Sequence, residues 1–210
     1  MESQFAQLEA SSITPTPRIN PYVGIVVGHW GDNNDPGAVC ADGQLNELQL
    51  NQTIATRLEK YLTSESVDVI LLKEFDQKLS NFQASALISL HADSCDYIND
   101  LATGYKVAAA IGSKRPERSA RLASCLRSRY SQATGLPLHS TSVTPDMTSY
   151  HAFSEINSDT PAAIIETGFL NLDREYLVNN PDSIAQGVAE GILCFLRNES
   201  INPLATNEAP

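Results

Sequence analysis

Residues 22–62 read YVGIVVGHWGDNNDPGAVCADGQLNELQLNQTIATRLEKYL. The stretch begins with a short apolar run, continues through a loop rich in Gly, Asp, Asn and Pro, and ends in a helical pattern that starts near Asn46 or Glu47. An apolar strand that stops at Gly28 and His29 would place an imidazole at the carboxyl edge of a sheet, where open α/β folds bind ligands. We therefore expect the chemistry of this protein at that edge.

The helix in this stretch brings a carboxylate onto its apolar face. Its buried stripe is made of Leu50, Ile54, Leu58 and Tyr61. Extended back by three residues, the same stripe reaches Glu47. A carboxylate in this place is paired, protonated or bound to a metal, because leaving it dry and charged is costly. Acidic residues in first turns also complement the helix dipole, so Glu47 alone leaves both interpretations open.

The composition is that of one globular domain. The chain has 210 residues, of which 42% are hydrophobic and 19% are charged, enough to bury a sizeable core. Its formal net charge of -11 argues against binding to nucleic acid or to an anionic membrane surface, since both depend on basic patches. The chain has no apolar run of the length that crosses a bilayer, so we expect no membrane insertion.

The ends of the chain differ in composition from its middle. We expect a flexible leader over residues 1–21, one folded domain over residues 22–198 and a polar tail over residues 199–210. The leader has an acidic second residue and no hydrophobic segment, which is not the pattern of a signal peptide. The sequence therefore leaves the route of any export open.

The four cysteines contain no CxxC pair, which excludes a zinc ribbon and a dense disulfide framework. They are Cys40, Cys95, Cys125 and Cys194. Two disulfides are possible in an exported protein, whereas Cys125 and Cys194 also suit small hydrophobic positions on helical faces. The sequence leaves their redox state undecided.

Strands and helices alternate along the rest of the chain. Four apolar runs have the composition of strands: 66–72, 86–90, 105–111 and 161–165. Helical spacing extends over 116–133 and from Pro181 onward. Two weaker patterns indicate a short helix near 79–84 and an edge strand over 149–156. This alternation predicts a single α/β domain with a mostly parallel, twisted sheet and helices on both of its faces.

Three of the predicted strands end on a residue that can take part in catalysis. His29 follows the first strand, His91 follows 86–90 and Glu166 follows 161–165. In a parallel sheet these ends open on one edge, so the three side chains can converge with Glu47. Two imidazoles and a carboxylate suit a catalytic zinc, and a further carboxylate can move protons. We assign His29, Glu47 and His91 to the metal and Glu166 to the proton transfer.

Four blocks of the chain resemble, in order, those of the zinc-dependent N-acetylmuramoyl-L-alanine amidases often called type 3. They read GHWGDNNDPGAV, LNELQLNQTIATRLEKYL, LISLHADS and PAAIIETGFLNLDREYL, and the resemblance spans residues 22–197. It implies that His29, Glu47 and His91 bind zinc and that Glu166 is catalytic. It also implies that the domain over residues 22–198 hydrolyses the amide bond between N-acetylmuramic acid and L-alanine in peptidoglycan.

Other residues near these blocks have weaker assignments. Trp30 stands where the family usually has Gly, and its ring could stack on a sugar or pack against its own loop. Ser89 and Ser94 flank His91 and could hold its ring in orientation. Asp35 precedes a Pro-Gly turn, and we expect it to shape that loop rather than to bind metal.

The resemblance further implies a peptidoglycan or muropeptide substrate and an extracytoplasmic location, in the periplasm or the cell wall. We expect the protein to be a monomer. Two other functions stay open: a zinc peptidase or amidohydrolase that acts on another amide bond, and a degenerate domain that binds the cell wall without catalysis. The presence of all four proposed residues argues against the second, because a domain that had lost catalysis would have no reason to keep Glu166.

Overall fold

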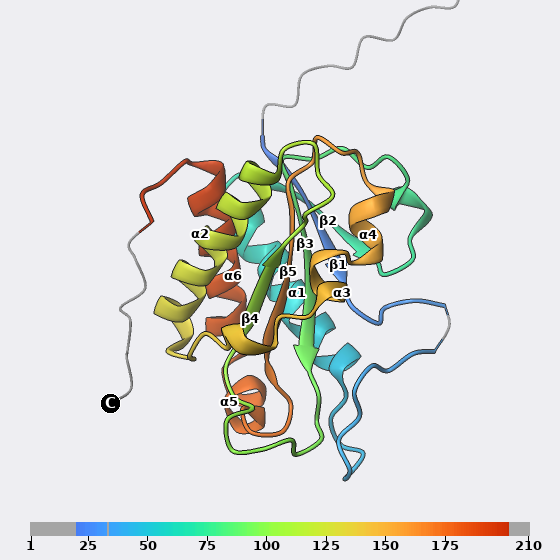
Figure 1. Cartoon of the computed structure of the whole chain (residues 1–210), viewed down its shortest axis with the longest axis vertical. Coiled ribbons are helices and arrows are strands. Elements are labelled where there is room, and N and C mark those ends of the chain that lie inside the picture. The colour runs from blue at the N-terminus through green and yellow to red at the C-terminus, as the bar shows by residue number, and fades with distance from the viewer. Residues whose placement is uncertain (1–19, 33, 202–210) are drawn as a thin grey trace, which may run out of the picture.

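The computed structural model describes residues 20–32 and 34–201 (Figure 1). Most of the expected leader over residues 1–21 and of the expected tail over residues 199–210 lies outside the described residues. Within them, no helix combines the length and the apolar character that a membrane span requires.

Five strands form one sheet in the order β2-β1-β3-β5-β4. Their bounds are Tyr22–Val27 for β1, Asp68–Lys73 for β2, Ala86–Asp93 for β3, Lys106–Ala109 for β4 and Ala162–Phe169 for β5. β1 pairs in parallel with β2 and β3, and β3 pairs in parallel with β5. Only the short strand β4 is antiparallel, because the chain returns to it from β3 through a loop without a crossover helix. The predicted mostly parallel sheet is therefore confirmed.

Helices cover both faces of this sheet, as expected (Figure 1). The long helices on one face are α1 (Glu47–Ser64), α2 (Pro116–Thr134) and α6 (Pro181–Leu196), which share one apolar core with the sheet. The short helices α3 (Pro145–Thr148) and α4 (His151–Glu155) bury Met147 and Ala152 in smaller clusters on the other face. The remaining elements are α5 (Arg174–Asn179) and the 3-10 turns η1 (Gln77–Leu79) and η2 (Ser140–Ser142).

Two of the weaker predictions are wrong. Residues 149–156 form no edge strand, because Ala152 and Ile156, four residues apart, are both buried against the sheet, which is a helical spacing. The short helix expected near 79–84 is instead the 3-10 turn η1, which ends at Leu79. The side chain of Asp76 caps this turn by accepting a hydrogen bond from the Lys78 N–H at 3.0 Å.

The connectivity creates a topological switch point between β1 and β3. From β1 the chain passes through α1 to β2 on one side, whereas β3 lies on the other side of β1. The order in which the strands are added thus reverses between β1 and β3. Open α/β sheets bind their ligands at such a point, beyond the carboxyl ends of the strands. His29 follows β1 and His91 lies near the end of β3, so the two histidines lie at this switch point.

Two disulfides link the described cysteines. Cys40 pairs with Cys95 and joins the loop before α1 to the loop after β3. Cys125 pairs with Cys194 and joins α2 to α6, and both residues are fully buried. The structure thus decides a question that the sequence left open, and the first disulfide ties together the segments that carry Glu47 and His91.

Candidate metal and catalytic site

His29 is held at the end of β1 through its backbone. Its φ of 64° lies in the left-handed region, which is unfavourable for a residue with a side chain. The His29 N–H donates a hydrogen bond to Glu74 Oε2 at 2.7 Å. The Glu74 N–H in turn donates to the carbonyl of Trp30 at 2.8 Å. This reciprocal pair of bonds stabilises the turn that brings the imidazole to Glu47.

Glu47 opens α1 and leaves only 4% of its surface exposed. Its carboxylate accepts hydrogen bonds from the N–H of Ala38 at 3.2 Å and of Ala92 at 3.1 Å. The side chain of Asn46 caps the same helix end by accepting from the Gln49 N–H at 2.9 Å. The backbone donors and the positive end of the helix dipole together allow an anion to be buried here.

Two imidazoles meet on the Glu47 carboxylate. His29 Nε2 lies 3.1 Å from Glu47 Oε2, and His91 Nδ1 lies 3.1 Å from Glu47 Oε1. One ligand atom from each of the three residues lies within 4.8 Å of the others. Two imidazole nitrogens and a carboxylate oxygen in a shielded place are the donor set of a catalytic zinc site. The residues present therefore fit a zinc ion.

In the metal-free protein the buried Glu47 carboxylate stabilises the protonated form of both histidines. The hydrogen bond to Glu47 raises the pKa of His29 to about 9. Burial is the largest single effect on His91 and opposes a charge there, but the hydrogen bond to Glu47 and the nearby carboxylates together raise the pKa of His91. Burial also opposes a charge on Glu47, yet the two histidines hold its pKa far below the usual range. A metal ion must therefore displace protons from the ligand nitrogens at neutral pH.

Gly28 leaves room for the His91 ring. It follows Val27, which pairs with Leu90, and its N–H donates to the Leu90 carbonyl at 3.0 Å, so Gly28 lies beside His91 in the next strand. A Cβ atom on Gly28 would lie 2.4 Å from His91 Cε1, closer than atoms can approach. The Gly-His pair thus supplies one imidazole and accommodates the other.

We expect Gly28→Ala to weaken zinc binding by about 10–100-fold, because the displaced His91 ring would lose its alignment with Glu47. Calorimetric titration of the metal-free protein with zinc measures this effect. Gly112→Ala is the matched control, since a Cβ there meets open space. Equal zinc affinities for the two variants would contradict the steric role of Gly28.

Glu166 lies beside His91 in the sheet. The two residues are paired in the register of β3 and β5, so their side chains lie on the same face of neighbouring strands. Glu166 Oε2 is buried and has no hydrogen-bond partner among the described residues. Burial raises the pKa of Glu166 to about 7. An unpartnered carboxyl group with a pKa near neutrality is a candidate general base and acid.

Lys106 of β4 lies next to Glu166 of β5, as His91 of β3 does on the other side. It pairs with Glu166 in the register of the two antiparallel strands, is buried, and forms an ion pair with Asp93. The charges of His91 and Lys106 lower the pKa of Glu166, whereas those of Glu47 and Asp93 raise it. These opposing charges partly cancel, which leaves burial as the main cause of the raised pKa.

The other residues singled out in the sequence lie around this set. Trp30 is partly buried and packs against the main core. Ser89 is fully buried, and the Ser94 hydroxyl accepts a hydrogen bond from the Asp96 N–H at 3.0 Å. Among the described residues, no hydrogen bond joins either serine to the ring of His91.

Three side chains that the sequence reasoning did not assign to the site contact it. Asp35 accepts from the Gly37 N–H at 2.9 Å, as a loop-shaping residue should, but its other oxygen lies 2.9 Å from His29 Nδ1. Glu74 directly follows β2, so searching for reactive side chains at strand ends, as was done for the histidines, would have identified it as a candidate site residue. Tyr150 contacts His91, with its hydroxyl 3.4 Å from Nε2. It lies in the segment 149–156, which was wrongly predicted as a strand, and no sequence motif there indicated a functional residue.

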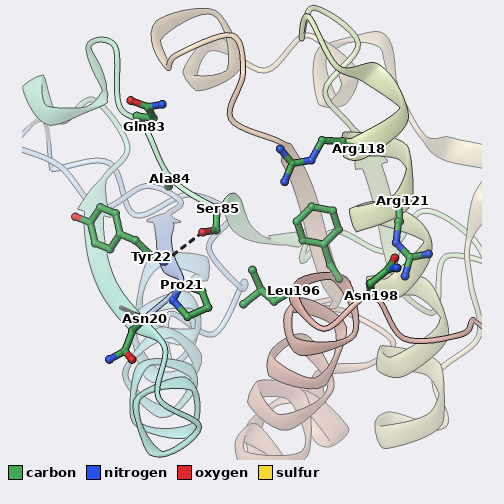
Figure 2. A pocket seen from close by; sticks show the side chains of 11 residues that line it. Asn20, Pro21, Tyr22, Gln83, Ala84, Ser85, Arg118, Arg121, Leu196 and Asn198 are labelled. Carbon is green, nitrogen blue, oxygen red and sulfur yellow. Dashed lines mark hydrogen bonds between the residues drawn. The ribbon is translucent and has the colours of Figure 1, made fainter. Parts of the chain in front are cut away.

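A separate cavity of about 890 Å³ lies at the opposite edge of the sheet (Figure 2). Its lining includes Pro21, Tyr22 and Ser85 near the starts of β1 and β3, and Arg118 and Arg121 of α2. The lining residues include no histidine and no carboxylate. This cavity is therefore not the proposed catalytic site, although it is large.

Comparison with known families identifies the class of enzyme. The family model Amidase_3, described as N-acetylmuramoyl-L-alanine amidase, matches residues 23–194. The chain therefore belongs to this family of amidases, which are hydrolases that degrade the peptidoglycan of the cell wall. Zinc dependence is a general feature of the family. A search of curated proteins finds no significant match.

Solved structures with this fold include several amidases. The N-acetylmuramoyl-L-alanine amidase from Clostridium difficile 630 is 23% identical with a TM-score of 0.68, and the match covers 86% of this chain and 99% of that one. The CwlD amidase from Clostridioides difficile, in complex with the GerS lipoprotein, is 20% identical with a TM-score of 0.66, covering 86% and 100%. Ami1 from Mycobacterium smegmatis is 17% identical with a TM-score of 0.67, covering 85% and 98%. These matches confirm the fold.

Proposed function

We propose that this chain hydrolyses the amide bond between N-acetylmuramic acid and the L-alanine of the stem peptide, with a zinc ion held by His29, Glu47 and His91. Glu166 is the general base and acid. The observation that carries the proposal is the convergence of two imidazoles on one buried carboxylate, beside an unpartnered glutamate, in a chain of this family.

The ligand atoms follow from the contacts of each side chain. His29 faces Glu47 with Nε2 and His91 faces it with Nδ1, so these nitrogens and the Glu47 carboxylate would hold the metal. Bound zinc would polarise the lactyl carbonyl and lower the pKa of a water molecule toward neutrality. The buried position of Glu47 keeps the donor set together before the substrate arrives.

Glu166 moves the proton. It takes a proton from the attacking water as the new carbon–oxygen bond forms, and it passes this proton to the nitrogen of L-alanine as the carbon–nitrogen bond breaks. A pKa of about 7 suits both steps near neutral pH. The products are an N-acetylmuramic acid carboxyl group and a stem peptide with a free amine.

The disulfides support an extracytoplasmic location. Such bonds persist in oxidising compartments and are rare where thiols are kept reduced. Both pairs here, Cys40 with Cys95 and Cys125 with Cys194, are formed. Together with the action of the family on the cell wall, they favour the periplasm or the cell wall as the working compartment.

Zinc affinity should rise with pH. Below its pKa of about 9 the metal-free His29 holds a proton that zinc must displace. We expect the affinity to increase about tenfold per pH unit for this proton between pH 6.5 and about 9, and to level off above. Competition with a chelator of known pH dependence measures the slope. A constant affinity between pH 7 and about 9 would contradict the protonated His29.

The test of the proposed function combines metal analysis with product analysis. The purified protein is assayed for bound zinc and then incubated with peptidoglycan, and the released fragments are identified by mass spectrometry. One zinc per chain and free stem peptides with a new L-alanine amine are the expected result. Cuts at another amide bond would indicate a peptidase on the same scaffold, and neither zinc nor products would indicate a domain that only binds the wall.

A further inference from the structure

We propose that Glu74 is a positioning residue that orients both histidine ligands, one directly and the other through Tyr150. This inference rests on the proposed zinc site. Glu74 has no part in the ligand set or in the proton transfer assigned to Glu166. It is nevertheless a buried carboxylate with 8% of its surface exposed, and burying such a group is costly unless it is well paired.

The sheet places Glu74 beside the turn of His29. Val27 and Lys73 are the last paired residues of β1 and β2, so Glu74 and Gly28 leave the sheet side by side. Glu74 Oε2 accepts from the His29 N–H at 2.7 Å, and the Glu74 N–H donates to the Trp30 carbonyl at 2.8 Å. The carboxylate thus stabilises the left-handed backbone on which the position of the His29 imidazole depends.

Tyr150 connects the second oxygen of Glu74 to the other histidine. The Tyr150 hydroxyl donates to Glu74 Oε1 at 2.9 Å and lies 3.4 Å from His91 Nε2. The rings of Tyr150 and His91 pack edge to face, with centroids 5.5 Å apart. Tyr150 can accept one hydrogen bond while it donates another, so it suits a bridge between an imidazole N–H and a carboxylate.

This bridge selects one tautomer of His91. Nδ1 of His91 faces Glu47 on the proposed metal side, so the ring hydrogen belongs on Nε2. The Nε2 hydrogen then donates to Tyr150, whose own hydrogen donates to Glu74. An outer partner of this kind fixes the tautomer and the ring orientation of a metal-binding histidine.

Glu74 could instead be a ligand of a second ion, since one atom each of His29, Asp35 and Glu74 lie close together. The contacts of His29 favour the positioning role. Its Nδ1 lies 2.9 Å from Asp35 but 4.0 Å from Glu74, and its Nε2 faces Glu47. With Nε2 committed to the proposed zinc and an Nδ1 hydrogen donated to Asp35, no ring lone pair remains for another ion.

The experiment compares Tyr150→Phe, Glu74→Gln and Glu74→Ala with the wild type. Zinc stoichiometry and affinity are measured by chelator competition. The tautomer of the neutral His91 ring is read from its imidazole nitrogen shifts by NMR of the metal-free protein at high pH. We expect zinc binding to weaken by about 100-fold in Glu74→Ala and about tenfold in Tyr150→Phe, with Glu74→Gln in between because its amide keeps one acceptor oxygen. The control is Glu65→Gln, because Glu65 is exposed at the far end of α1, pairs with Arg197 and contacts none of the proposed ligands.

The outcomes separate this inference from the function on which it rests. A wild-type protein that binds no zinc would refute the proposed site itself. One zinc per chain, with unchanged affinity and an unchanged His91 tautomer in the variants, would refute only the role of Glu74. Two zinc ions in the wild type and one in Glu74→Gln would make Glu74 a ligand and also overturn the inference. Tyr150→Phe keeps the aromatic packing, so this comparison survives if Glu74→Ala fails to fold.

Discussion

Glu166→Gln is expected to lower the rate of muropeptide release by about 10²–10⁴-fold while zinc stays bound. The amide has nearly the shape of the carboxyl group, but it cannot take a proton from water and return it to the departing amine. The Oε2 atom of Glu166 has no hydrogen-bond partner among the described residues, so the substitution breaks no structural bond there. Product release measured by mass spectrometry gives the rate, and metal analysis gives the zinc content.

The matched control for this experiment is Glu175→Gln. Glu175 lies on α5 and is exposed, so the same chemical change there should leave both rate and zinc content near those of the wild type. A Glu166→Gln protein that keeps the full rate would refute the assigned proton transfer. Loss of zinc along with the rate would instead place Glu166 in the metal site.

His91→Ala should abolish stoichiometric zinc binding and with it the hydrolysis. Zinc affinity should fall by more than the factor of about 10–100 expected when a residue that only hydrogen-bonds a ligand is removed, because His91 is one of the three proposed ligands. The metal-free protein should also lose stability, by up to about 3–5 kcal/mol, since a buried carboxylate loses one of its two imidazole partners. The remaining hydrogen bonds of Glu47 to His29, Ala38 and Ala92 should limit that loss.

His139→Ala provides the comparison for His91→Ala. His139 packs its ring against Phe169 at a centroid distance of 5.2 Å and belongs to neither group of potential ligands. Its removal should leave zinc content unchanged. Thermal unfolding of both variants, with and without added zinc, distinguishes a lost ligand from a lost fold. Zinc should raise the unfolding temperature of His139→Ala and have little effect on His91→Ala.

Local patterns predicted most of the sheet and the long helices. The strands that carry His91 and Glu166, and the one that precedes His29, begin as short apolar runs, which are recognised without knowledge of the fold. Two of the predicted strand ends are too early, because β3 continues to Asp93 and β5 to Phe169 through their pairing with each other. The helix that opens at Glu47 was recognised from its apolar stripe. The structure buries Leu50, Ile54 and Leu58 of that stripe and partly buries Tyr61. The family resemblance carried by the same segments agrees with the match over residues 23–194.

The segment around Tyr150 shows where local patterns fail. Its buried side chains include Met147, Ala152 and Ile156, which are few and widely spaced, so the helical spacing of the two short helices was too weak to recognise. The cysteine pairs were equally inaccessible, because they join residues 55 and 69 positions apart. Only the packed chain decides which distant residues meet.

The sequence by itself determined the α/β class, the parallel character of most of the sheet and the edge at which the reactive side chains lie. These properties follow from the short-range periodicity of apolar residues and from the shared direction of parallel strands. The tertiary structure alone decided that two imidazoles share the Glu47 carboxylate and that Glu166 stands unpartnered beside His91. It also decided that Glu74 contacts His29 and that Tyr150 contacts His91. Those contacts depend on strand register and on burial, which long-range packing sets and no local pattern encodes.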